Sequence, residues 1–318
     1  MAMTKGISSR QVWAVGVFVF TALSSLLVSF SRIDLIGVVY AFAVLGALAI
    51  FTQVWSQNVT LISFAGSSFK IEFGQVIIAF LAVIVVRFGL FYLSGTVWEK
   101  ASMIVLTILL IVYVERHQLI DFGLTLVRIF HQLLWGLIGT VSLWVSVALS
   151  SVFVPIVLGV NVSSYFFDVK EFSLSMLVAF AFFLIGNFAE ELFFRGYITT
   201  KLKKSGLVRA IIIQALLFAI YHLNYLIGYE GDLLGFGFYI VFVLLFGVLM
   251  GLVFVMTGSV ITTTIIHASF NIMFPTLQLA PLARTATEDV FFSSASYGVG
   301  VVMLVLLISL LLVMKRSR

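Results

Sequence analysis

Long runs of apolar residues alternate with short polar segments along most of the 318-residue chain. A helix that crosses a lipid bilayer needs ~20 mostly apolar residues. Ten runs approach that length, at roughly 11–30, 35–56, 75–95, 101–115, 132–155, 174–196, 207–227, 234–256, 258–276 and 296–314. This pattern predicts an all-α fold, a polytopic transmembrane helix bundle of about ten spans.

The composition agrees with a membrane protein, because 62% of the residues are hydrophobic and only 10% are charged, against ~25% charged in soluble proteins. The positive residues gather beside helix ends, where orientation signals lie, so the net charge of +5 does not indicate nucleic-acid binding. The predicted surroundings are a lipid bilayer, with no nucleic-acid partner. The chain has no cysteine, which excludes disulfides, thiolate metal ligands and a cysteine nucleophile.

The distribution of Lys and Arg predicts the orientation of the chain. With the N-terminus in the cytoplasm, 12 of the 18 Lys and Arg residues fall in inside segments and four, Lys100 among them, fall outside. This bias follows the positive-inside rule and predicts that both termini are cytoplasmic. Arg87 lies within a span, where it pairs with a carboxylate or extends toward the membrane surface.

Two segments between the runs have patterns of their own. Residues 59–73 alternate apolar and polar positions around Ala-Gly-Ser-Ser, which predicts a short hairpin. Residues 118–131 mix apolar with charged positions, which predicts an interfacial amphipathic helix. A plain connector is equally consistent with either pattern.

Residues 187–197 place two adjacent carboxylates, Glu190 and Glu191, at the end of an apolar run. Arg195 follows Glu191 by four positions, so these two side chains share a helix face and can pair. Glu190 points about 100° away from Glu191, so its carboxylate does not share the pair with Arg195 and can face other groups. Charges inside a membrane are costly and indicate a functional site by default.

Three other polar side chains lie within later spans. His222 follows Phe218 by four residues, and Asn271 follows His267 by four. Counting ~1.5 Å per residue from the helix ends brings both histidines, the amide and Glu190 to a similar level.

These groups suit water attack on an amide or ester. A carboxylate in an apolar site is a suitable general base for water, and an imidazole beside it can share that water. A second imidazole and an amide N–H can donate to a developing oxyanion. A single histidine in a membrane helix is as often a helix–helix hydrogen-bonding residue, and a Glu–Arg pair is as often structural, so both of these alternatives stay open.

The motifs Glu190-Glu191-x-x-x-Arg195, Phe218-x-x-x-His222 and His267-x-x-x-Asn271 occur in this order and spacing, and with them the chain resembles the CPBP family of intramembrane proteases. This family is also called the Abi or CAAX-protease family. The resemblance covers residues 174–276, the predicted catalytic core. Residues 1–173 form an N-terminal transmembrane region of about five spans, and residues 277–318 a loop and the last transmembrane helix.

The resemblance implies a helical membrane fold whose active-site cavity opens to the cytoplasm. Type II CAAX prenyl endopeptidases of this family cleave prenylated C-termini, so the implied partner is a peptide or protein substrate. By resemblance Glu190 is the base and His222 helps to activate the water, while His267 and Asn271 form the oxyanion site. The Glu191–Arg195 pair positions the first motif.

Members of the family are often labelled metalloproteases. A zinc ion would use Glu190, His222 and His267 as ligands. Metal-independent hydrolysis is the favoured interpretation, because the sequence has no HExxH signature and because water activation accounts for Asn271.

Two non-enzymatic functions are the alternatives. The first is a scaffold or bacteriocin immunity protein of the same fold, which would not require all four of the polar groups. The second is a transporter with Glu190 as a proton relay, which the lack of an internal repeat disfavours.

Overall fold

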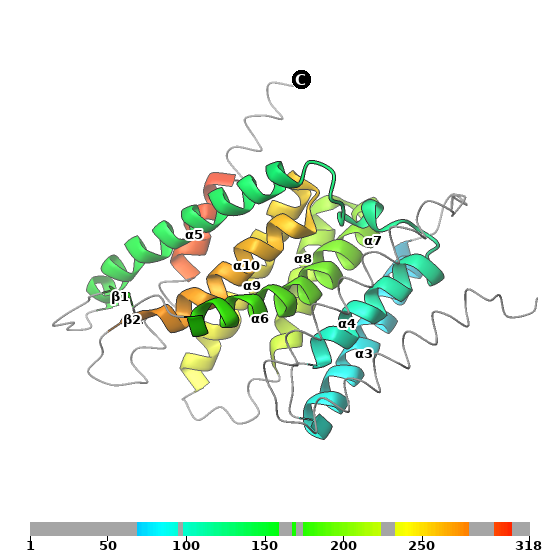
Figure 1. Cartoon of the computed structure of the whole chain (residues 1–318), viewed down its shortest axis with the longest axis horizontal. Coiled ribbons are helices and arrows are strands. Elements are labelled where there is room, and N and C mark those ends of the chain that lie inside the picture. Colours follow the sequence, from blue (N-terminus) through cyan, green and yellow to red (C-terminus); the bar gives the residue numbers. More distant parts are fainter. Residues whose placement is uncertain are drawn as a thin grey trace, which may run out of the picture.

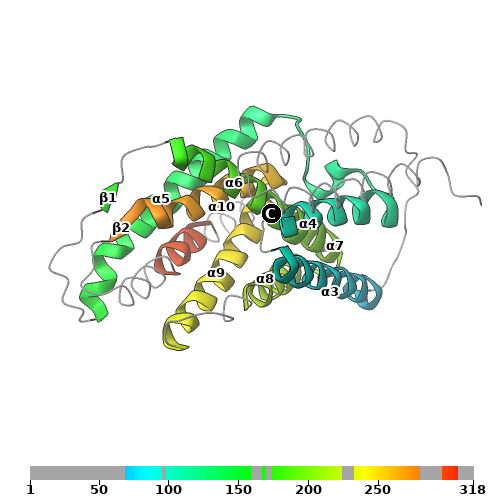
Figure 2. The same ribbon diagram turned by 60° about the horizontal axis from the view of Figure 1, so that its bottom comes forward.

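The computed structural model describes residues 69–94, 98–158, 167–169, 174–223, 233–279 and 296–306. The predicted spans at 11–30 and 35–56 lie outside these residues. The described part is a bundle of helices (Figures 1 and 2). The α-helices are α3 (Phe69–Ser94), α4 (Trp98–Leu109), α5 (Ile129–Leu158), α6 (Leu174–Glu191), α7 (Thr200–Leu202), α8 (Leu207–His222), α9 (Leu233–Thr257), α10 (Val260–Thr276) and a last helix, Ser296–Leu306.

Shorter elements extend or connect these helices. Two π-helices, η1 (Leu110–Val114) and η3 (Leu192–Thr199), continue α4 and α6, and two 3₁₀ turns are η2 (Leu119–Phe122) and η4 (Lys203–Ser205). Strands β1 (Phe167–Val169) and β2 (Leu277–Leu279) pair antiparallel, with Asp168 opposite Gln278. The helical fold is therefore confirmed, with this one small sheet added among the described residues.

The membrane spans are confirmed only in part. All eight predicted runs from 75–95 onward overlap described helices, and those at 207–227 and 296–314 extend beyond the described residues. Two helical segments of the described residues, Ile129–Ser150 and Phe236–Thr257, are long and apolar enough to cross a membrane. Four shorter apolar helices accompany them. The number of ten spans stays a prediction.

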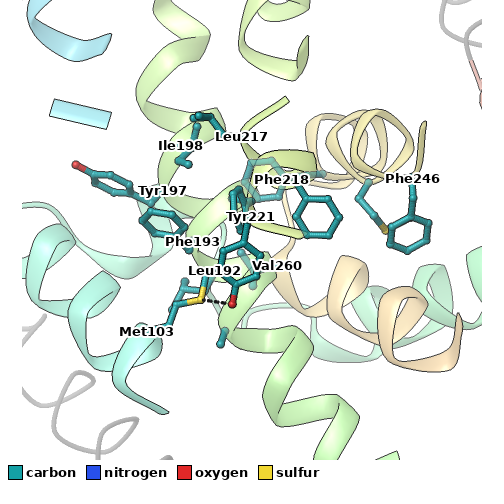
Figure 3. Close-up of a cluster of buried hydrophobic side chains, with 14 of the residues drawn as sticks. Met103, Leu192, Phe193, Tyr197, Ile198, Leu217, Phe218, Tyr221, Phe246 and Val260 are labelled. Carbon is teal, nitrogen blue, oxygen red and sulfur yellow. Dashed lines mark hydrogen bonds between the residues drawn. The ribbon is translucent and has the colours of Figure 1, made fainter. Parts of the chain in front are cut away.

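Helix packing places α4 and α10 against α6, and α8 against η3, the continuation of α6. α10 packs against α5 and α6, α8 against α9 and η3, and α4 against α3 and α6 (Figures 1 and 2). One buried hydrophobic cluster draws side chains from both sides of the predicted boundary at residue 174. Figure 3 shows part of this cluster, where Tyr221 of α8 meets Met103 of α4. The division of the chain at that boundary stays a prediction.

Small residues set the close approach between α5 and α10. A Cβ atom at Gly136 would lie 3.0 Å from the Ile265 side chain, and one at Gly139 would lie 2.3 Å from that of Ile266. Small residues allow membrane helices to approach in this way. The Trp144 indole donates a hydrogen bond to the Ser269 carbonyl at 3.2 Å across the same interface. α5 thus holds the helix that carries His267.

Residues 118–131 do not form the predicted helix. The 3₁₀ turn η2 ends at Phe122, and the following Gly123 has a φ of 81°, a left-handed conformation that stops a helix and favours glycine. Arg128 also has a positive φ, 56°, and α5 begins only at Ile129. The Gly123 carbonyl accepts a hydrogen bond from Val260 N at 2.9 Å, so the connector is joined to the start of α10.

The predicted hairpin at 59–73 is corrected in its second half. Residues 59–68 lie outside the described residues, and α3 begins at Phe69, so residues 69–73 are helical. Buried side chains recur at Glu72, Val76, Ala79 and Val83. This spacing is that of one helix face, and Glu72 in it belongs to the segment assigned to the second strand.

Gly298 provides a test of the helix packing. A Cβ atom there would lie 2.8 Å from the backbone of Val147 in α5, whereas one at Gly300 would have no neighbour within 4 Å. Backbone atoms cannot move aside as a flexible side chain can. Gly298→Ala should therefore lower the free energy of unfolding by about 1–3 kcal/mol, measured by thermal unfolding in detergent. Gly300→Ala on the same helix is the control, and equal stability of the two variants would contradict this packing.

Candidate active site

Three helices bring Glu190, His222 and His267 together. Glu190 lies near the end of α6, His222 is the last residue of α8, and His267 lies near the middle of α10. Glu190 Oε2 is 4.0 Å from His222 Nε2 and 3.9 Å from His267 Nε2. All three side chains are buried. The similar level predicted for these residues thus corresponds to a close approach of their polar atoms.

A change of helix type follows the two carboxylates. α6 ends at Glu191, and the chain continues as the eight-residue π-helix η3, all of whose residues are buried. The wider π turn leaves one position out of the α-helical register, and such segments frequently occur at functional sites. Gly196 allows close packing here, since a Cβ atom would lie 3.0 Å from the Phe122 carbonyl. Thr199 returns a hydrogen bond to the Phe194 carbonyl at 3.0 Å.

The predicted pairing of Glu191 with Arg195 is present. Arg195 Nη1 donates to Glu191 Oε1 at 3.0 Å, and both side chains are 0% exposed. The guanidinium also lies 4.3 Å from the centre of the Phe218 ring, a cation–π contact. The same Glu191 oxygen accepts a hydrogen bond from His267 Nδ1 at 2.7 Å. Glu191 therefore joins the first motif to the third.

Hydrogen bonds to the Nδ1 atoms orient both imidazoles. His222 Nδ1 lies 2.8 Å from the Phe218 carbonyl, which can only accept, so this nitrogen carries the proton. His267 Nδ1 carries a proton toward the Glu191 carboxylate for the same reason. In a neutral imidazole the Nε2 atom is then an acceptor. Two Nε2 atoms thus face Glu190 Oε2, which accepts no hydrogen bond from any described residue.

Asn271 lies one helical turn beyond His267 and faces the same helix, α6. Its amide donates to the Asn187 side-chain oxygen at 2.9 Å, and Asn187 lies one turn before Glu190. Each side-chain amide has two N–H donors, so Asn271 keeps a second one. The Asn187–Asn271 and Glu191–His267 contacts show that α6 and α10 run antiparallel at the site.

Sequence reasoning missed Lys100 and Tyr221. Lys100 Nζ makes an ion pair with Glu190 Oε1 and donates to the Tyr221 hydroxyl at 2.8 Å. The Tyr221 hydroxyl also contacts Met103 sulfur at 3.8 Å (Figure 3). The positive-inside count assigned Lys100 to an outside loop, because nothing near it in the sequence signals a carboxylate 90 residues away. Tyr221 directly precedes His222, and its sequence position marks it only as one of the apolar residues of that helix.

Arg87 pairs with a carboxylate, one of the two outcomes expected for it. Its Nε lies 3.5 Å from Glu99 Oε2, and its guanidinium carbon lies 3.8 Å from the centre of the Tyr221 ring. Arg87 is 4% exposed. The cation therefore belongs to the surroundings of the site and not to the membrane surface.

The residues proposed as zinc ligands do not fit a metal ion well in this arrangement. Zinc–ligand bonds of about 2.0–2.1 Å in a tetrahedral site place donor atoms roughly 3.3 Å apart, less than the 3.9 and 4.0 Å from Glu190 Oε2 to the two imidazoles. The second Glu190 oxygen holds the Lys100 ammonium, whose charge opposes that of a metal cation. Within the described residues, no group of three His, Asp or Glu side chains is arranged to hold a metal.

Comparison with known proteins identifies the segment that carries these motifs. Residues 172–273, about a third of the chain, match the family model of the type II CAAX prenyl endopeptidase Rce1-like proteins. This match confirms the resemblance found from the motifs, and it supports a protease in a membrane context with a peptide or protein substrate. No curated protein matches the chain. Lys100, Glu99 and Arg87 lie outside the matched segment.

The buried Glu191–Arg195 pair predicts a large cost for neutralising the carboxylate. Glu191→Gln leaves the Arg195 guanidinium buried without its counter-charge, which should lower the free energy of unfolding by about 3–5 kcal/mol. Asp121→Asn is the control, because Asp121 forms an exposed pair with His117 at the same i, i+4 spacing and should cost under about 1 kcal/mol. Unfolding in detergent measures both, and a similar small loss in the two variants would show that the buried pair is unimportant for stability.

Proposed function

We propose that the chain is an intramembrane endopeptidase that hydrolyses peptide bonds of membrane-associated proteins, with prenylated C-termini of the CAAX type as the leading substrate class. The observation that carries this proposal is the convergence of Glu190 Oε2 with two imidazole Nε2 atoms at 3.9 and 4.0 Å. Polar atoms at such a separation are typical partners of a bridging water. The substrate class rests on the family match of residues 172–273.

In the proposed reaction, Glu190 acts as the general base. A water oxygen attacks the carbonyl carbon of the scissile bond while Glu190 Oε2 takes one of its protons. His222 Nε2 accepts from the same water and orients it. The tetrahedral intermediate then breaks its C–N bond, and Glu190 returns the proton to the leaving amine. A general base of this kind typically contributes 10²–10⁴-fold.

Asn271 and His267 are the proposed donors to the oxyanion. Asn271 uses the N–H that Asn187 does not take. His267 donates from Nε2 in its doubly protonated form, whose charge the adjacent Glu191 carboxylate balances. Glu191 and Arg195 are positioning residues, since they contact His267 and the first motif and not the proposed water.

Replacing the base tests the enzyme assignment. Glu190→Gln keeps the shape of the side chain and removes its basicity, so kcat should fall about 10²–10⁴-fold. The measurement compares terminal peptides released in membranes that contain wild type or the variant. Glu115→Gln is the control, because Glu115 is a buried carboxylate that pairs with Lys201 and Tyr197 away from the site.

Wild-type turnover in folded Glu190→Gln would overturn the assignment of the base. A biological phenotype retained by Glu190→Gln, without any released peptide, would instead favour the alternative of a non-catalytic scaffold or bacteriocin immunity protein.

The oxyanion donor predicts a second kinetic signature. Asn271→Ala removes one donor, which should lower kcat about 10²–10³-fold and change KM much less, because the interaction strengthens only as the oxyanion forms. Steady-state kinetics on a peptide identified from the wild-type chain measures both constants. A rise in KM with kcat unchanged would place Asn271 in substrate binding instead.

A further inference from the structure

Lys100 reaches the candidate active site from a helix outside the family match. It lies in the first turn of α4, and its ammonium contacts Glu190 Oε1 and the Tyr221 hydroxyl. The side chain is 13% exposed. A cation is therefore placed directly on the carboxylate that the proposed reaction uses as its base.

The ion pair occupies only one of the two carboxylate oxygens. Oε1 is held by Lys100, while Oε2 faces the Nε2 atoms of His222 and His267. The last torsion of a glutamate side chain is broad, so the carboxylate group has little orientation of its own. We propose that Lys100 is a positioning residue that holds the Glu190 carboxylate with Oε2 toward the two imidazoles. This proposal rests on the proposed function.

Lys100 acts through Glu190 and not on the substrate's reacting atoms. An ammonium has three donors and no acceptor, so it cannot take the proton of the water. It lies on the carboxylate oxygen that does not face the imidazoles, the other side of the group from the proposed water. Its role is to hold the base in one orientation and to keep its negative charge balanced.

Further charges hold Lys100 in turn. Glu99 Oε1 lies 3.5 Å from Lys100 Nζ, and Glu99 Oε2 lies 3.5 Å from Arg87 Nε. The Arg87 guanidinium lies over the Tyr221 ring, whose hydroxyl accepts from Lys100. Two cations and two carboxylates thus alternate from α3 through α4 to α6. This network makes the region before residue 172 a structural part of the active site.

The chain offers a matched control for removal of this cation. Lys201 also pairs with a buried carboxylate, Glu115, and its side chain is also 13% exposed. The Glu115–Lys201 pair joins the C-terminal end of the α4–η1 segment to α7, away from Glu190. Lys100→Met and Lys201→Met therefore remove the same charge from similarly buried pairs.

The experiment measures kcat and KM of the purified full-length protein with a peptide that the wild type cleaves. Lys100→Met should lower kcat roughly 100-fold, as expected when a catalytic group loses its position, with KM changed less than about threefold. Lys201→Met should leave both constants near wild type. Lys100→Arg restores the charge and the donors, and should return kcat to within roughly tenfold of wild type.

A second variant covers the case in which Lys100→Met does not fold. Tyr221→Phe removes the hydroxyl that holds Lys100 but keeps the ring beneath Arg87, and it should lower kcat about tenfold. Wild-type kcat in folded Lys100→Met, or in Tyr221→Phe where the first variant is unfolded, overturns the positioning role.

Failure of this inference can be told from failure of the proposed function. If wild type cleaves the peptide, Glu190→Gln does not, and Lys100→Met is as fast as wild type, only the role of Lys100 is wrong. If wild type cleaves no peptide, both proposals are wrong.

Discussion

The candidate site depends on the compensation of two adjacent buried carboxylates by two cations. Glu190 and Glu191 project in directions about 100° apart, so each needs its own partner within the bundle. Lys100 of α4 balances the first, and Arg195 of η3 balances the second. A buried carboxylate without a counter-charge is strongly destabilising. These two ion pairs therefore hold α4 and η3 in fixed relation to the end of α6.

The remaining geometry follows from the hydrogen-bonding capacity that each carboxylate keeps after it has paired with its cation. Glu191 shares one oxygen between Arg195 and His267, which orients the His267 ring on α10. Glu190 directs its second oxygen toward the space between α8 and α10, where the two Nε2 atoms lie. Phe218 packs between these groups, with its ring centre 4.4 Å from that of His222 and 5.9 Å from that of His267. Charge pairing and aromatic packing thus bring one carboxylate oxygen and two imidazole nitrogens together in an arrangement that suits a bound water.

Local patterns in the sequence predicted the parts of the site that depend on helical spacing. The Glu191–Arg195 pair follows from an i, i+4 relation, and the shared level of Glu190, His222 and His267 follows from helix rise. Long-range partners leave no such trace, and for this reason Lys100 was placed in a loop.

The prediction of an amphipathic helix at 118–131 failed for another reason, and the alternative of a connector holds there. Its apolar spacing resembles a helix, but the backbone is left-handed at Gly123 and Arg128. Gly123 packs against Phe254 of α9 and accepts a hydrogen bond from Val260 of α10, and these long-range contacts leave no trace in the local sequence. The structure adds one constraint to the family resemblance, because α3 and α4 lie outside the matched segment and yet supply charges to the site.

The central claim is that Glu190 activates a water for direct attack, with no covalent intermediate on the protein. Hydrolysis of a defined membrane-associated peptide by the purified chain in the presence of hydroxylamine tests it most directly. Hydroxylamine intercepts an acyl–protein intermediate, such as the anhydride that nucleophilic attack by Glu190 would form, whereas direct water attack forms no such intermediate. The account predicts that every new C-terminus is a free carboxylate. A hydroxamate-ended product would contradict it.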